Sequence, residues 1–155
     1  MINILIVGAG KGIGLETARL LKDENLFTIS RHATAELDSL ETQFFELDVS
    51  KDDLSNLSLP EELHGLVFCP GSVNLRPFNR LTEEDFLADF NQNFMGAVRI
   101  IQKCLPALKK SKAASIVLFS TVAAKVGMPF HTSIAASKGA IEGFAKSLAA
   151  ELAAA

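Results

Sequence analysis

The stretch VGAGKGIG, residues 7–14, is the part of the sequence that is most informative about the fold, because it sets closely spaced glycines between an apolar run and an amphipathic run. The apolar run at 2–7 predicts a strand, and the amphipathic run at 13–24 predicts a helix. A glycine pattern alone is weak evidence, since turns use glycine routinely. A strand, a glycine loop and a helix within one βαβ unit, however, indicate a dinucleotide site.

The glycines of this loop have different expected roles. Gly8 can make the tight turn off the strand, Gly12 lets the backbone approach a pyrophosphate, and Gly14 lets helix and strand pack closely. The free N–H groups and the positive end of the helix dipole would then face the anion. The candidate residues for this contact are Gly8, Gly10, Lys11, Gly12, Ile13 and Gly14.

Outward from the loop, short β-rich apolar runs alternate with longer amphipathic ones, which is the pattern of a parallel sheet covered by helices on both faces. We predict an α/β fold: a Rossmann-like, doubly wound sheet of order 3-2-1-4-5 in three layers, forming a single domain over 1–155. The predicted strands are 2–7, 26–30, 43–47, 64–69 and 115–120. The predicted helices are 13–24, 35–41, 51–57, 82–110 and 133–152, the fourth capped by Thr82 and the last by Thr132 or Ser133.

The composition excludes several classes of partner and site. A formal charge of -3 on 155 residues gives no broad basic field, so nucleic acid and anionic membranes are not expected partners. The opening MINILIV has no basic region before it and is too short to span a membrane, so we expect a cytoplasmic protein. Two cysteines, Cys69 and Cys104, are predicted to be buried thiols rather than a disulfide or redox pair. His32, His64 and His131 are scattered, so no metal site is predicted.

The end of the second predicted strand bears on the choice of cofactor. An acidic side chain there would bind the ribose 2′-OH of NAD, but the sequence reads Ser30-Arg31-His32. Arg31 and Lys11 could instead hold a 2′-phosphate, which favours NADP(H) over NAD(H). The alternative interpretation is that both are solvated surface cations.

With these motifs placed, the whole chain resembles the short-chain dehydrogenase/reductase family. The resemblance is carried by GAGKGIG (8–14), LDVS (47–50), FCPG (68–71), NQNFMGA (91–97), IVLFSTVAAKVGMP (116–129) and IAASKGAIEGF (134–144). It implies a nicotinamide-dependent oxidoreductase in which Asp48 and Val49 touch the adenine ring. FCPG stands where the family has Asn-Asn-Ala-Gly, so it adds Pro70 and Gly71 to the candidate cofactor residues.

The resemblance also assigns candidate active-site residues. Asn93 matches the family's asparagine, which would hold a bound water, and Lys138 matches the lysine that holds the nicotinamide ribose. The serine position falls on Thr121, with Ser120 as the alternative if the register slips by one. The tyrosine position falls on Ile134, and the chain contains no tyrosine.

Two residues near Ile134 are candidates for the missing acid. His131 is the better acid near neutral pH, and Ser133 is the other candidate. A loop histidine exposed to water is the alternative interpretation of His131.

The first functional hypothesis is therefore an NADP(H)-dependent oxidoreductase acting on a small carbonyl or alcohol. The second is a catalytically inactive dinucleotide-binding protein of the same fold.

The long predicted helices suggest assembly. An apolar stripe on helix 82–110 and the alanine-rich face of helix 133–152 offer more apolar surface than one sheet face needs, so we expect a homodimer or homotetramer through these helices. The apolar stripe on helix 82–110 consists of Phe86, Phe90, Phe94, Ala97, Ile101, Leu105 and Leu108. Members of the family usually continue with a further strand, a substrate-covering segment and a last strand, so we expect the chain to be truncated.

Overall fold

The computed structural model describes residues 1–153. Its contacts divide the chain into two compact units, each made of two segments. The first unit comprises residues 1–69 and 99–117, and the second comprises 70–98 together with the chain from 118 onward. A single domain over 1–155 stays a prediction, and its last two residues lie outside the described part.

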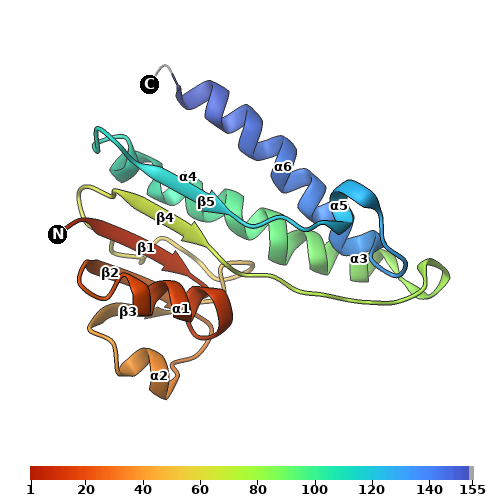
Figure 1. The fold of residues 1–155 in the computed structure, drawn as a ribbon, viewed down its shortest axis with the longest axis horizontal. Coiled ribbons are helices and arrows are strands. Elements are labelled where there is room, and N and C mark those ends of the chain that lie inside the picture. Colours follow the sequence, from red (N-terminus) through yellow and green to blue (C-terminus); the bar gives the residue numbers. More distant parts are fainter. Residues whose placement is uncertain (154–155) are drawn as a thin grey trace. The chain divides into compact units, whose positions relative to one another are not determined.

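A five-stranded parallel sheet forms the centre of the first unit, in the predicted order β3-β2-β1-β4-β5 (Figure 1). Alternating apolar runs with short turns between them produce this doubly wound α/β arrangement. In the register, Ile6 of β1 lies opposite Thr28 on one side and Val67 on the other. The strands are β1 Asn3–Val7, β2 Asn25–Ser30, β3 Thr42–Glu46, β4 Gly65–Phe68 and β5 Ser115–Leu118.

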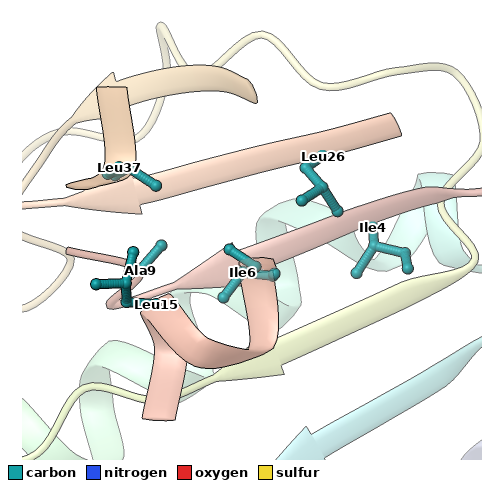
Figure 2. Close-up of a cluster of buried hydrophobic side chains, with 7 residues drawn as sticks. Ile4, Ile6, Ala9, Leu15, Leu26 and Leu37 are labelled. Carbon is teal, nitrogen blue, oxygen red and sulfur yellow. The ribbon is translucent and has the colours of Figure 1, made fainter. Parts of the chain in front are cut away.

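One face of the sheet packs against α1 (Gly12–Leu20). Successive strand residues point to opposite faces, so Ile4 and Ile6 share a face and pack with Leu15 of α1 (Figure 2). The cluster also contains Leu37 of the short helix α2 (Ala35–Asp38). This packing fixes the start of α1 directly after β1, where the glycine loop lies.

Residues 99–108 of α4 (Gly96–Leu108) run behind the sheet, on the side away from α1 (Figure 1). Ile100 and Cys104 are fully buried there, and Leu63 N–H donates to the carbonyl of Ala107 over 3.0 Å. The sheet thus lies between helices, as predicted. Cys104 is buried as predicted, whereas Cys69 is only half-buried.

The second unit is helical. Its elements are η1 Phe78–Arg80, α3 Glu83–Phe90, the π-helical segment η2 Asn91–Met95, the first turn of α4, α5 Ala123–Val126 and α6 Thr132–Leu152. Thr82 caps α3 as predicted, in a capping box with Asp85. The predicted cap of the last helix was wrong, because His131 occupies that position and its side chain makes no capping bond.

The predicted helices 13–24 and 35–41 end earlier than expected, at Leu20 and Asp38, and two further predicted helices differ more from the structure. Residues 51–57 form turns, because the carboxylates of Asp48 and Asp53 each accept the backbone N–H two residues further on, from Ser50 and Ser55. Such local bonds compete with helix formation. The predicted helix 82–110 is not one regular α-helix, since η2 interrupts it. No helix within residues 1–153 is long and apolar enough to cross a membrane; a cytoplasmic location stays a prediction.

Candidate functional site

The glycine loop of the first unit has the backbone geometry that only glycine adopts without strain. Gly8 and Gly12 have φ angles of 80° and 56°. A Cβ placed on Gly14 would lie 2.2 Å from the carbonyl oxygen of Gly8, so a side chain cannot fit between helix and loop. The loop is anchored to β2, because the N–H groups of Gly8 and Ala9 both donate to the carbonyl of Ile29, over 2.7 and 3.1 Å.

The N-terminus of α1 is open to an anion. Lys11 occupies the capping position, and its side chain makes no capping bond. The first N–H groups of a helix have no acceptor within the helix, so those of α1 can be donated to a ligand. Lys11, Gly12 and Ile13 are all exposed.

The end of β2 lies next to this loop. A Cβ on Gly10 would come within 3.2 Å of the Ser30 hydroxyl, and that hydroxyl donates to the carbonyl of His32 over 2.5 Å. Arg31 is exposed. It borders a hollow of about 360 Å³, whose lining residues are Arg31, His32, Glu46, Leu47, Asp48, Lys51 and Asp52.

Asp48 is a charged part of the lining of this hollow. Partial burial opposes its ionisation, but bonds from the hydroxyl and N–H of Ser50, helped by the charges of Lys51 and Arg31, hold the pKa of Asp48 below its usual range. The ammonium of Lys51 lies 3.7 Å from the Asp48 carboxylate. The adjacent Val49 is buried at 3% exposure. The carboxylate is therefore held in place and charged at neutral pH.

Sequence reasoning missed the residue that holds this loop. Arg99 of α4 donates to the carbonyl of Val49 over 2.7 Å and also to that of Asp52. An arginine at an ordinary position of an amphipathic helix carries no signal of such a partner. Its guanidinium fixes the loop through the backbone, so the loop's own side chains remain available to line the hollow.

In the second unit, Asn93 is completely buried in the π-helical segment. Its Nδ2 donates to the Ser72 hydroxyl over 2.9 Å and to the carbonyl of Asp89 over 2.8 Å, and its Oδ1 accepts the N–H of Ser72 over 3.4 Å. The side-chain amide thus has partners at both ends. π-Helical turns of this kind are frequent at functional sites.

Lys138 of α6 approaches the same place. It is buried at 8% exposure, and a Cβ on Gly71 would lie 4.0 Å from its Nζ and 3.3 Å from Oδ1 of Asn93. Gly71 therefore leaves space that both polar atoms face. Pro70, the residue before it, is half-buried. The structure brings together three predicted site residues here: Gly71, Asn93 and Lys138.

Asp89 was also missed by sequence reasoning. Its carboxylate is buried at 3% exposure and accepts hydroxyl hydrogens from Ser72 and Ser133, each over 2.6 Å. A signal was available, because an acid four residues before Asn93 lies on the same helix face. The hydroxyl of Ser133, a candidate acid, thus already donates a hydrogen bond to a carboxylate within the protein.

The remaining predicted active-site residues lie in the sequence shortly before and just after the start of α6. The Thr121 hydroxyl is half-buried and accepts the N–H of Ala123 over 3.3 Å, whereas exposed Ser120 donates to Glu142 over 2.6 Å. His131 is half-buried, with Nδ1 bonded to the carbonyl of Pro129 over 2.7 Å. Ile134 is buried at 4% exposure. The Thr121 hydroxyl can still donate a hydrogen bond, whereas the hydroxyl hydrogen of Ser120 is bonded to Glu142.

The part of the chain that the structure describes contains no group of three or more His, Cys, Asp or Glu side chains that could hold a metal ion. The predicted site residues offer hydrogen-bonding groups, the buried ammonium of Lys138 and the uncapped N-terminus of α1.

Comparisons with known proteins show the family and the fold of the chain. A family model described as short chain dehydrogenase matches residues 3–155. The chain is 31% identical over 167 residues to human retinol dehydrogenase 8, covering 97% of this chain and 54% of that protein. It is 31% identical over 169 residues to 3-oxoacyl-acyl-carrier-protein reductase FabG of Thermotoga maritima, covering 96% and 67%. The chain thus spans little more than half to two thirds of these curated relatives.

A solved structure described as a short chain dehydrogenase/reductase family protein superposes with a TM-score of 0.91 at 25% identity. The superposition covers 99% of this chain and 69% of that one.

Proposed function

Since the chain belongs to the short-chain dehydrogenase/reductase family, whose members are oxidoreductases that bind NAD or NADP, we propose that it binds NADP(H) and transfers hydride between the nicotinamide and a small carbonyl or alcohol. The observation that carries the proposal is the glycine loop, in which a turn at Gly8 leads to the uncapped N-terminus of α1 at Gly12, and both glycines have positive φ angles. This geometry fits a pyrophosphate.

The residues in and around the glycine loop would hold the adenosine half of the cofactor. Gly12, Ile13 and Gly14 offer backbone N–H groups to the pyrophosphate, and Ser30 lies beside the loop. Arg31 and Lys11 would bind a 2′-phosphate, because guanidinium and ammonium groups make charge-assisted bonds to phosphate. Asp48 and Val49 would contact the adenine.

The predicted active-site residues would act at the reacting end of the cofactor. The bound nicotinamide would supply or accept the hydride, and the chain's own groups would orient the reactants. Lys138 would hold the nicotinamide ribose, with Pro70 and Gly71 beside it, and Thr121 would donate its hydroxyl to the substrate carbonyl. Asn93 would hold a water molecule through its carbonyl oxygen.

Proton delivery is the weak step of this site, because buried Ile134 has no proton to give. We propose His131 as the donor. Its Nδ1 is bonded to the Pro129 carbonyl and so carries a hydrogen, which means that only the protonated ring can donate from Nε2. Ser133 is less suitable, since its hydroxyl is buried and donates to Asp89.

Ile134 also supports a second candidate function, a dinucleotide-binding protein without turnover. In that case the glycine loop and the surroundings of Asn93 and Lys138 would bind the cofactor with no proton transfer. Fold alone does not separate the two, because one fold hosts many activities.

The experiment is to titrate NADPH and NADH into the full chain by calorimetry and to follow NADPH consumption over a panel of aldehydes and ketones. We expect NADPH to bind more tightly than NADH, with slow turnover on a few substrates that His131→Ala lowers. Binding without turnover on any substrate would favour the second function. Absence of binding to both nucleotides would contradict both.

A further inference from the structure

Asp89 is a buried carboxylate to which the proposed reaction gives no role. It lies on α3 at 3% exposure, and its two oxygens accept hydrogens from two hydroxyls that belong to different segments. Ser72 lies in the chain just after β4, and Ser133 lies in the first turn of α6. One side chain thus ties three segments of the second unit together.

The bonds around Asp89 form a chain with one direction. Nδ2 of Asn93 donates to the Ser72 hydroxyl over 2.9 Å, and that hydroxyl donates to Oδ1 of Asp89 over 2.6 Å. A carboxylate only accepts, so the Ser72 hydrogen is committed to Asp89 and the Ser72 lone pairs are left for Asn93. Asn93 must therefore present its NH₂ group to Ser72.

The opposite end of the amide is fixed as a result. Because NH₂ faces Ser72 and the Asp89 carbonyl, Oδ1 of Asn93 faces the Ser72 N–H and the space beside Gly71 that Lys138 Nζ also approaches. The reversed amide would place NH₂ against an N–H and near an ammonium, which sets donors against donors.

We propose that Asp89 is a positioning residue, which fixes the direction of this hydrogen-bond chain so that Asn93 presents its carbonyl oxygen toward Lys138. The expected effect of Asp89 on cofactor binding rests on the proposed function, whereas its effect on the orientation of Asn93 does not. The substitution Asp89→Asn keeps the volume of the side chain but replaces one hydrogen-bond acceptor by a donor. The hydrogen bond from Ser72 or the one from Ser133 would then have to reverse its direction or break.

The test compares Asp89→Asn with Ser137→Ala in the full chain. Ser137 is a matched control, because it is also a buried α6 serine but donates only to a backbone carbonyl, that of Ser133, over 3.1 Å. NMR of ¹⁵N-labelled protein follows exchange of the Asn93 side-chain NH₂ with water. We expect Asp89→Asn to speed this exchange about tenfold, a factor that corresponds to a loss of about 1.4 kcal/mol, and Ser137→Ala to leave it unchanged.

A second measurement separates the role in binding from general damage. Adenosine 2′,5′-bisphosphate probes only the adenosine half of the cofactor, whereas NADPH also needs Lys138. We expect Asp89→Asn to weaken NADPH about tenfold and to leave the bisphosphate unaffected. Unchanged NH₂ exchange in Asp89→Asn overturns the proposal, and so does an equal loss of NADPH affinity in Ser137→Ala. If the parent binds no NADPH, the proposed function fails, and the exchange measurement still decides the orientation.

Discussion

Ile134 and Lys138 lie one turn apart on α6, and both are buried, at 4% and 8% exposure. Burying an ammonium is costly unless polar atoms face it, and Oδ1 of Asn93 lies across the space left by Gly71. Burying isoleucine carries no such requirement. The site therefore retains the cation of Lys138 and the side-chain amide of Asn93. Ile134, one turn before Lys138, provides only apolar contact at the position where a proton donor would be expected.

Restoring an acid at position 134 is expected to raise activity. Ile134→Tyr would place a phenol one turn before Lys138, whose positive charge lowers the pKa of a nearby hydroxyl. Positioned proton transfer is typically worth about 10²–10⁴ in rate, so we expect NADPH consumption with simple carbonyl compounds to rise toward this range. Ala136→Tyr, at an exposed position of the same helix, is the control and should change nothing.

Two outcomes would contradict this view. Fast turnover by the parent that survives His131→Ala would place the acid elsewhere. A parent and an Ile134→Tyr variant that both bind NADPH and both stay inactive would favour the non-catalytic function.

Arg31 is expected to decide the cofactor preference. Arg31→Ala should remove most of the preference for NADPH over NADH, by roughly 1–3 kcal/mol for a charge-assisted contact, and leave NADH affinity nearly unchanged. Calorimetric titration of both nucleotides measures the difference. Lys22→Ala, which removes an exposed cation from the same unit, is the control. Equal affinities of the parent for the two nucleotides would contradict the prediction.

Asp48 gives a pH-dependent prediction. Its pKa is lowered in the folded chain, so its ionised form stabilises the fold at neutral pH, and this contribution is lost as pH falls through the lowered pKa, below the ordinary 3.8. Asp48→Asn should therefore reduce the free energy of unfolding at pH 7, and the difference from the parent should shrink on acidification. Urea unfolding at several pH values measures this, with exposed Asp23→Asn as the control. A difference that grows toward acid pH would refute it.

At the level of secondary-structure elements, the consecutive segments α3, η2 and α4 show what apolar periodicity can and cannot predict about a helix. Its apolar spacing predicts a helix over 82–110, and helical structure does run from Glu83 to Leu108. The π-helical segment within it is not visible in that spacing. One extra residue per turn changes which side chains face inward, and Asn93 lies within this segment.

The candidate site was predictable to different degrees. The glycine loop follows from local sequence, since its roles depend on neighbours in the chain. Arg99 could not be found in this way, because its acceptors lie 50 and 47 residues away and are backbone carbonyls, which carry no sequence signature. Helix 51–57 was wrong for a local reason, the competition of Asp48 and Asp53 for backbone N–H groups.

Arg99 is expected to support the loop at 48–52. Arg99→Ala removes two bonds from a charged donor to the carbonyls of Val49 and Asp52, which should cost about 2 kcal/mol of unfolding free energy. It should also weaken adenosine 2′,5′-bisphosphate, because the loop borders the hollow. Lys103→Ala is the control, since this lysine on the same helix makes one exposed bond to the Ser55 carbonyl. Denaturant unfolding and calorimetry measure the two effects; equal losses in both variants would contradict the assigned role.

At the scale of the whole molecule, the order of the five strands follows from the alternation of apolar runs, because parallel strands need crossover helices and right-handed crossovers restrict the order. The division of the chain into two units does not follow from the alternation of apolar runs. That division depends on contacts between segments far apart in the chain, which no local pattern records.

We propose that the chain pairs with a second copy through the surfaces of 82–110 and 133–152. Phe90, Phe94 and Phe144 form a ring cluster, with centroids 4.8 and 5.6 Å apart, and Leu105 is only half-buried. Sedimentation at micromolar concentration should show a dimer or tetramer, and Leu105→Glu should dissociate it, because burying a charge in an apolar contact is costly. Leu20→Glu, at an exposed leucine of α1, should not. A monomeric parent would contradict the proposal.

Each unit of the chain is assembled from two stretches separated by part of the other. During synthesis, β1, β2, β3 and β4 emerge first and can begin to pair, but the residues that complete this half of the protein arrive only after the 29 residues from Pro70 to Val98 have left the ribosome. Closing such long loops costs entropy before any contact repays it, which slows folding. A protease cut between 70 and 98 would therefore release neither half. It would leave two fragments held by non-covalent contacts alone, and refolding would become a concentration-dependent association.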